Sequence, residues 1–388
     1  MPVMGALRAP GLSGDVGSLE HRGRKPLKAA LLSSVPGELQ IEDVEVGEPG
    51  PREVLVRTAA AGICHTDSHF MEGKYPYPLP AVLGHESAGV VEAVGSMVGY
   101  VKSGDHVITC LSAFCGHCEQ CTSGHPSLCE NSGTELVRSA GEPPRLSTNG
   151  QHVNQFLHLS SFAERMLVHE QTLVRITPDM PLDRAALIGC AVTTGLGAVF
   201  RTARVSPGET VVVIGCGGVG LSAIQGARIA GANRIVAVDR IGWKLELAKE
   251  FGATHTINGE EEDSVLALLH LIPDGVHHAF EAVGMKQTAE QAFAMLRRGG
   301  QATVMGMIPV GTKIELPGSD FIWEKTITGS NMGSNQFRTD IPRFIDMYMD
   351  GRLNLDAMVS KTIPIEDINS GFAEMKSGNV ARTVISFD

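Results

Sequence analysis

Four of the chain's eight cysteines lie within fifteen residues. Cys115, Cys118, Cys121 and Cys129 have the spacing C-x2-C-x2-C-x7-C. Four thiolates so spaced can close a tetrahedron around zinc, at about 2.3 Å per bond, with no position left open for chemistry. The spacing therefore predicts a structural zinc site.

Two other interpretations of this loop remain open. An iron–sulfur cluster also uses four thiolates, but the ferredoxin run has a three-residue final gap followed by proline, whereas the gap here has seven residues. Four cysteines in so short a loop rarely serve packing alone. His117 and His125 lie in the same loop, and either could replace one thiolate.

A second metal site is predicted from residues far apart in the chain. A catalytic zinc needs three protein ligands and one exchangeable position, and two thiolates with one imidazole form a recognised set. Cys64, His85 and Cys190 supply that set. Their spacing alone is only moderately specific, because an isolated cysteine is more often a small buried apolar residue. Cys110 and Cys216 are interpreted as such packing residues.

A glycine-rich segment predicts a dinucleotide site. It has the form G-x-G-x-x-G and follows an apolar run at 210–214; its residues are Gly215, Gly217, Gly218, Val219 and Gly220. Glycines allow a tight turn and a close approach of backbone to pyrophosphate, and the following helix offers its N–H groups.

The next strand ends at Asp239, whose carboxylate can accept both adenosine ribose hydroxyls and would repel a 2′-phosphate. NAD is therefore favoured over NADP. Arg240 follows it, however, and could partly accommodate a phosphate.

The elements that position these residues fall into two groups. Short strands at 28–32, 53–60 and 89–94, separated by Gly and Pro, indicate an irregular β domain. From 210 onward, apolar strands alternate with amphipathic helices, which is typical of a doubly wound parallel sheet with α/β architecture. We expect strands at 210–214, 234–238, 277–282, 301–305 and 326–329, and helices at 219–230, 243–251 and 288–296.

Length and composition set the limits of the interpretation. A chain of 388 residues predicts two domains: a zinc-binding domain from 25–191 and 332–388, and a dinucleotide-binding domain over 192–331. Residues 1–24 are interpreted as a poorly ordered extension. Acidic residues outnumber basic ones, 43 to 32, which argues against nucleic acid and anionic membranes as partners. No apolar run is interpreted as a membrane span or signal peptide, so a cytoplasmic protein with a small-molecule ligand is expected.

From about residue 28 to the end, the chain resembles the zinc-dependent alcohol dehydrogenases of the medium-chain dehydrogenase/reductase superfamily. The resemblance rests on motifs in the family's order: G-I-C-x-T-D-x-x-H, G-H-E, the four-cysteine loop, G-C-x-x-x-T-G, the glycine-rich segment with Asp239, and the closing S-G-x-x-x-R-T. It implies a GroES-like catalytic domain beside a Rossmann domain, with two zinc ions per chain and NAD.

The resemblance also implies roles for single residues. Cys64, His85 and Cys190 would hold the catalytic zinc, with Glu86 behind it and Asp67 orienting His85. Zinc would act as a Lewis acid on the alcohol oxygen, and hydride would pass to the nicotinamide. Thr66 and His69 would carry the alcohol's proton to solvent. The implied cofactor contacts are pyrophosphate with His65 and Arg382, adenosine ribose with Lys244, and nicotinamide with Thr194 and Val219.

An apolar substrate cleft follows from the same resemblance. Its lining would be Tyr75, Leu111, Phe156, Leu157 and Met307, which suits primary alcohols or aldehydes with aliphatic or aromatic tails. The branch that acts on glutathione adducts of formaldehyde has an arginine where this chain has Gly133, and an aromatic residue in place of His69. These departures weigh against a glutathione adduct, although another thiol carrier stays open.

Two further alternative functions and the oligomeric state can be weighed from the sequence. Polyol dehydrogenases usually replace the third ligand with glutamate, which Cys190 argues against. A non-catalytic cofactor-binding or redox-sensing protein would keep only the structural metal; retention of Thr66 and His69 with the three ligands argues against it. The long segment between Cys129 and Cys190 is similar to that of dimeric members, so a homodimer is expected.

Overall fold

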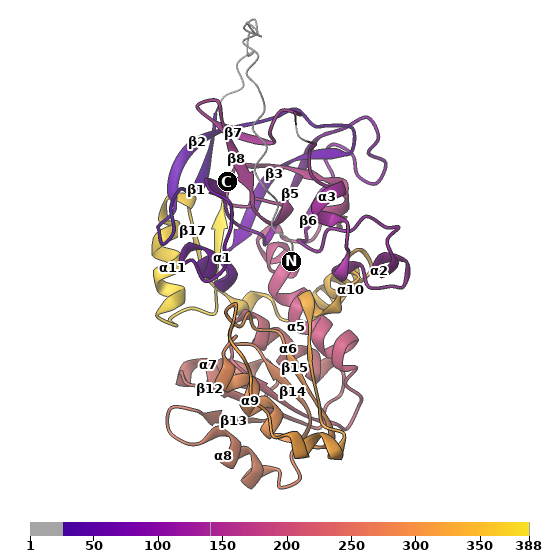
Figure 1. Ribbon diagram of the computed structural model, residues 1–388, viewed down its shortest axis with the longest axis vertical. Helices are drawn as coiled ribbons and strands as arrows, with labels where there is room; N and C mark the ends of the chain where they lie inside the picture. Colours follow the sequence, from indigo (N-terminus) through magenta and orange to yellow (C-terminus); the bar gives the residue numbers. More distant parts are fainter. Residues whose placement is uncertain (1–25, 140, 388) are drawn as a thin grey trace, which may run out of the picture.

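The computed structural model describes residues 26–139 and 141–387. The expected extension over residues 1–24 lies outside the described residues. The chain forms two lobes (Figure 1), one built on a closed barrel and a seven-stranded sheet and the other on a six-stranded sheet. This is the mixed α/β architecture predicted from the sequence.

The β-rich lobe draws its strands from both ends of the chain. The barrel consists of β1 (Leu27–Leu32), β2 (Gln40–Val46), β7 (Leu146–Thr148), β8 (Gln151–Gln155) and β4 (Ala81–Val82). The seven-stranded sheet has the order β10 (Leu173–Arg175), β6 (His106–Thr109), β5 (Ser87–Val94), β3 (Glu53–Gly62), β18 (Arg382–Ser386) and β17 (Val359–Ile363), with β9 (Arg165–His169) also on β3. β18 pairs antiparallel with β3, so the C-terminal stretch does return to this lobe.

The second lobe is a parallel sheet. Its order is β13 (His255–Asn258), β12 (Arg234–Asp239), β11 (Thr210–Ile214), β14 (Val276–Glu281), β15 (Leu296–Val304) and β16 (Thr326–Gly329), and every pair is parallel. Helices α6 (Gly218–Ile229), α7 (Gly242–Glu250), α8 (Ser264–Leu271) and α9 (Lys286–Ala294) connect the strands. Such crossovers bury both faces of a parallel sheet, which explains the nearly continuous apolar strands.

Sequence reasoning misplaced some boundaries in this lobe. The helix expected at 288–296 ends at Ala294, because Leu296 already pairs with Val276 at the start of β15. The strand expected at 301–305 is correspondingly longer at its start. β13 and α8 were not predicted. The limits of the two domains at 191/192 and 331/332 stay a prediction.

A long apolar helix joins the two lobes. Leu182–Ala203 runs through α4 (Leu182–Leu187), η4 (Ile188–Val192), α5 (Thr193–Gly197) and η5 (Ala198–Ala203), and both η segments have π-helical geometry. By length and composition it could cross a bilayer, which corrects the expectation that no stretch qualifies. Of its most apolar 18-residue stretch, 83% is buried within the protein, as in a core helix. In Figure 1, α5 lies at the junction of the lobes.

The remaining α-helices of the described chain belong to the β-rich lobe or its border. They are α1 (His65–Met71), α2 (Glu119–Thr122), α3 (Ser132–Glu135), α10 (Phe337–Met349) and α11 (Ile368–Lys376). α1 directly follows β3, and η4 lies near the middle of the long helix. Chain segments that are distant in sequence therefore meet between the lobes, where the candidate ligands Cys64 and Cys190 lie.

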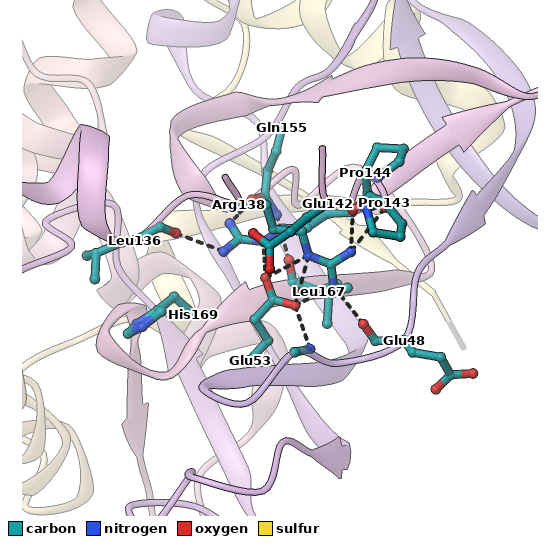
Figure 2. Close-up of polar contacts among 12 residues, drawn as sticks. Glu48, Glu53, Leu136, Arg138, Glu142, Pro143, Pro144, Gln155, Leu167 and His169 are labelled. Atoms are coloured by element: carbon teal, nitrogen blue, oxygen red, sulfur yellow. Dashed lines mark hydrogen bonds and ion pairs between the residues drawn. The ribbon is translucent and has the colours of Figure 1, made fainter. Parts of the chain in front are cut away.

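A buried ion cluster fastens one loop to the β-rich lobe (Figure 2). Glu53, at the start of β3 and 4% exposed, accepts hydrogen bonds from Arg145 Nε at 2.6 Å and from Arg138 Nε at 3.1 Å. Arg145 also donates to the Leu136 carbonyl at 2.8 Å and to Gln155 at 2.7 Å. Although burial raises the pKa of Glu53, the two arginines lower it to about 2. Residues 136–139 and 141–145 are thereby tied to β3 and β8.

Candidate active site

The structure brings Cys64, His85 and Cys190 together between the two lobes. Their ligand atoms all lie within 4.8 Å of one another, and all three side chains are buried. Cys64 precedes α1, His85 follows β4, and Cys190 lies in η4. Within the described chain, the Nε2 atom of His85 is buried without a hydrogen-bond partner. A buried imidazole nitrogen facing two thiols is the donor set that zinc takes.

A carboxylate fixes the orientation of the imidazole. Asp67 Oδ1 lies 3.1 Å from His85 Nδ1 and accepts the Gly84 backbone N–H at 3.1 Å. Burial lowers the pKa of His85, but the negative charges of Asp67 and Cys64 raise it more, so its net pKa lies well above the ordinary value. With Nδ1 occupied by Asp67, Nε2 is the nitrogen available to a metal.

The two thiols behave as a pair. A hydrogen bond between them lowers the pKa of Cys64 well below its ordinary value and raises that of Cys190 well above it. Metal binding requires both thiols as thiolates.

Glu86 and Arg382 form an ion pair behind the three ligands. Arg382, at the start of β18, donates to Glu86 Oε1, and Ala191 N donates to Glu86 Oε2 at 3.1 Å. Both side chains are buried. Burial raises the pKa of the Glu86 carboxyl to about 7, against the opposing effect of Arg382. The pair is 296 residues apart in sequence; sequence reasoning named both residues but not their contact.

The glycine-rich turn has a separate geometric reason for each motif glycine. Gly215 has φ +96, which favours glycine at the turn, and a Cβ on Gly220 would lie 1.7 Å from the Gly215 carbonyl oxygen. A Cβ on Gly217 would meet nothing within 4 Å, so this backbone borders open space. Gly217 is also the N-cap residue of α6 and makes no side-chain cap hydrogen bond. These are the features of a pyrophosphate-binding turn.

One cavity of about 460 Å³ joins the glycine-rich turn to Cys64. Its lining includes Cys64, Thr66 and His69 at one end and the acidic strand end at the other. The remaining predicted residues on its wall are His65, Gly215, Gly217, Gly218, Val219, Asp239, Lys244, Met307 and Arg382. Arg382 Nε is buried without a partner among residues 26–387 apart from 140, as a donor for a bound anion would be. The residues present therefore fit a dinucleotide.

Both oxygens of Asp239 already accept backbone hydrogen bonds. Cys216 N donates to Oδ2 at 2.7 Å and Ile241 N donates to Oδ1 at 3.0 Å. Each carboxylate oxygen can accept a second bond, so ribose hydroxyls remain within its capacity. Arg240 forms an exposed ion pair with Glu260 at 2.9 Å.

Of the two proposed proton-relay residues, Thr66 contacts the other lobe and His69 contacts its own. Thr66 Oγ1 lies 3.3 Å from Met307 Sδ, which belongs to the other lobe. His69 stacks on Tyr75, with ring centroids 6.2 Å apart, and its Nδ1 atom is buried and unpaired within the described part of the chain. Burial, followed by the charge of Lys74, lowers the pKa of His69.

Thr194, the predicted nicotinamide contact, is absent from the cavity lining, and its Oγ1 atom lies 3.4 Å from Met332 Sδ.

The five residues expected to line the substrate cleft are not all gathered there. Tyr75, Leu157 and Met307 pack at the border of one apolar cluster. Phe156 is fully buried inside that cluster, where it packs edge-on against Phe70, so it does not reach a cleft surface. Leu111 packs on a different cluster. The family resemblance implied which side chains would line the cleft. Whether such a side chain is exposed there depends on how neighbouring aromatic rings pack against it.

The four cysteines of the loop converge as predicted. Cys115, Cys118, Cys121 and Cys129 place their sulfur atoms within 4.8 Å of one another. The geometry favours four thiolates over a histidine substitute, because His117 instead pairs with Glu135 at 2.7 Å. His125 lies 3.3 Å from Ser123 Oγ. The donor set fits a closed tetrahedral zinc site.

A further wall of the cavity was not found from the sequence. It comprises Ala282, Val283, Met285, Met305 and Gly306, which follow β14 and β15 and stand beside the predicted Met307. The buried Glu281 accepts from Val283 N at 2.9 Å, Gly284 N at 2.7 Å and Thr288 Oγ1 at 2.7 Å, and so shapes that wall. The rule that ligands bind beyond the carboxyl ends of parallel strands could have indicated it.

Comparison with known proteins agrees with this geometry. The family model for the alcohol dehydrogenase GroES-like domain matches residues 50–178, and that for zinc-binding dehydrogenase matches residues 218–348. A relative from Haemophilus influenzae, S-(hydroxymethyl)glutathione dehydrogenase, is 38% identical over 93% of this chain and 97% of its own length. The structure described as an alcohol dehydrogenase zinc-binding domain protein, from Burkholderia ambifaria, has a TM-score of 0.89 at 35% identity, covering 94% and 99% of the chains. Benzyl alcohol dehydrogenase from Acinetobacter calcoaceticus has a TM-score of 0.87 at 34% identity, covering 94% and 100%.

Fold and site together define an oxidoreductase with a metal centre beside a dinucleotide cavity. The chain belongs to the zinc-dependent medium-chain dehydrogenase/reductase family. This confirms the resemblance drawn from the sequence.

Proposed function

We propose that this protein is a zinc-dependent alcohol dehydrogenase that oxidises primary aliphatic or aromatic alcohols to aldehydes with NAD. One observation carries the proposal: Cys64, one of three converging candidate ligands, lies in the same cavity as the glycine-rich turn. Hydride transfer requires the reacting carbon to meet the nicotinamide, and a shared cavity provides that proximity.

The chain's residues have distinct tasks in this reaction. When bound, zinc supplies Lewis-acid polarisation of the alcohol oxygen, and NAD accepts the hydride. Cys64, His85 and Cys190 would hold the metal, and Asp67 keeps the His85 imidazole oriented. Thr66 lies in the cavity with a hydroxyl that can accept and pass on the alcohol's proton, and His69 lies beyond it on α1.

The cofactor contacts follow from the cavity lining. The N–H groups at the start of α6 and the unpaired Nε of Arg382 favour the pyrophosphate, within the residues that the structure describes. Asp239 and Lys244 line the region beyond the turn, where the adenosine ribose would lie. The Asp239 carboxylate disfavours a 2′-phosphate, which supports NAD.

A thiol adduct of formaldehyde is the second candidate substrate. Relatives from Haemophilus influenzae and Photobacterium damsela subsp. piscicida are named S-(hydroxymethyl)glutathione dehydrogenase, at 38% and 39% identity. The benzyl alcohol dehydrogenase neighbour instead supports an aromatic alcohol. At the positions of Gly133 and His69, the glutathione branch has other residues. A simple primary alcohol therefore remains the first candidate substrate.

The test is a substrate panel with the zinc-loaded protein. Reduction of NAD would be followed with ethanol, longer primary alcohols, benzyl alcohol, and formaldehyde with glutathione. We expect the highest kcat/KM for a simple primary alcohol. A rate with formaldehyde that requires glutathione would replace that assignment with the second candidate. Metal analysis should find two zinc ions per chain; a single ion would favour a non-catalytic protein.

We also propose a cytoplasmic homodimer. β16 is an edge strand of the parallel sheet and most of its residues are exposed. Beside it in the sequence, Phe321, Ile322 and Trp323 are exposed by 48%, 79% and 47%. An edge strand flanked by exposed apolar side chains is the kind of surface that a second copy covers.

A further inference from the structure

Segment 330–336 has an unusual backbone between the two lobes. Met332, Gly333 and Ser334 have φ values of 49, 73 and 49, three left-handed residues in succession. Only glycine adopts this conformation without steric cost, so Met332 and Ser334 are strained. Such strain persists where neighbouring structure holds the backbone from several sides.

The long helix holds the segment from one side. A Cβ on Gly333 would lie 2.4 Å from the Thr193 carbonyl oxygen, and one on Gly197 would lie 2.5 Å from the Gly333 carbonyl oxygen. Thr202 Oγ1 lies 2.7 Å from Ser330 Oγ and 2.8 Å from Ser334 Oγ. The segment is therefore in backbone contact with the helix that carries Cys190 and Thr194.

The four-cysteine loop and its approach hold the segment from the other side. Asn331 Nδ2 donates to the Ser127 carbonyl at 2.8 Å, and Gln336 Nε2 donates to the Gly124 carbonyl at 2.8 Å. Both acceptors lie between Cys121 and Cys129. Asn335 Nδ2 donates to Ser112 Oγ at 2.8 Å and to the Met332 carbonyl at 2.8 Å. Through these three side-chain amides, the position of the loop determines the position of the strained backbone.

Within the segment, Met332 contacts the part of the long helix that follows Cys190. Met332 Sδ lies 3.4 Å from Thr194 Oγ1. Thr194 is one helical turn after Cys190 and therefore lies on the same side of the helix. A nicotinamide placed next to Cys190 for hydride transfer would lie near this turn, although Thr194 does not itself line the cavity.

We propose that the four-cysteine loop buttresses the cofactor site, with Asn331, Asn335 and Gln336 as positioning residues. The inference rests on the proposed function, because it concerns the NAD of that reaction. The loop would then do more than stabilise its own surroundings. When metal fixes the loop, the loop sets the positions of Met332 and Thr194. These positions in turn set the affinity for the nicotinamide end of the cofactor.

The experiment compares Asn331→Ala with Gln336→Ala, singly and combined, in the zinc-loaded protein. Asn331 is exposed and Gln336 is half-buried, so both variants should fold. NADH binding is measured by its fluorescence without substrate, alongside zinc content, kcat and KM for NAD. We expect the double variant to bind NADH about tenfold more weakly, with zinc content unchanged and KM for NAD raised more than kcat is lowered.

His117→Ala is the matched control. His117 belongs to the same loop but pairs with Glu135, not with segment 330–336. It should leave NADH affinity unchanged. Wild-type affinity in the double variant, or an equal loss in His117→Ala, would overturn the inference. Failure of the NAD-linked reaction looks different, because the wild-type protein itself would then not bind NADH, whereas a change of alcohol substrate alone would leave NADH binding intact.

Discussion

Asp239 combines a structural and a binding task in one carboxylate. Its two oxygens hold the backbone of Cys216 and Ile241, and its position in the cavity suits the adenosine ribose. We expect Asp239→Gly to raise the ratio of kcat/KM for NADP over NAD by about tenfold or more, because repulsion of the 2′-phosphate disappears. Initial rates with both cofactors measure this ratio.

A double variant tests the contribution of the neighbouring Arg240 to that change. Adding Arg240→Ala to Asp239→Gly should reduce the gain with NADP, since Arg240 would leave Glu260 to contact the phosphate. An unchanged cofactor ratio in Asp239→Gly would show that the carboxylate does not face the ribose.

For single residues, the sequence predicted those features whose residues lie close together in the chain. Gly215 and Gly220 could be assigned because the turn geometry requires them, and Gly217 because a pyrophosphate has to approach the backbone there, all within six residues. The pairing of Glu86 with Arg382 and the burial of Phe156 could not, because both result from packing between segments far apart in the chain. The ligand set Cys64, His85 and Cys190 needed the family resemblance for the same reason.

Among the elements, β3 depends on the ion cluster at its first residue. Glu53→Gln would leave Arg138 and Arg145 without their counter-charge in a buried place (Figure 2). We expect the free energy of unfolding to fall by about 3 kcal/mol near pH 7. Urea unfolding of the zinc-loaded protein measures this loss.

The pH dependence of the difference is a sharper test. Glu53 has a pKa lowered from 4.5 to about 2 in the folded protein, so its ionised form stabilises the fold above pH 4.5. That stabilisation is lost as pH falls from 4.5 through 2. The difference between wild type and Glu53→Gln should therefore be equal at pH 7 and 5 and smaller at pH 3. Glu142→Gln, in the same segment, is the control, and an equal loss there would contradict the role of Glu53.

Element boundaries show why periodicity predicts only part of the fold. The strands at 210–214 and 326–329 were predicted to the residue, because each is a short apolar or β-branched run bounded by turn residues. β15 begins five residues before its predicted start, since pairing of Leu296 with Val276 overrides the helical pattern of the preceding residues. Strand pairing depends on a neighbour that a local window does not contain.

For the whole molecule, the exposed apolar residues beside β16 predict the oligomeric state. Wild-type protein should have a mass in light scattering of twice 41.2 kDa. Ile322→Asp should shift it toward the monomer, because a charge in the covered apolar patch is costly to bury. Leu266→Asp, on α8 and 58% exposed, is the control and should remain dimeric. A monomeric wild-type protein would refute the assignment.

The helix Leu182–Ala203 has a consequence for how the chain is made. Its apolar side chains pack against Val211, Val213 and Leu221, and also against Phe337 and Phe344, which follow more than 130 residues later. During translation this stretch leaves the ribosome long before its last covering residues exist. Until they arrive it presents a surface that resembles a membrane segment, so the nascent chain is most vulnerable to mistargeting and aggregation over that interval.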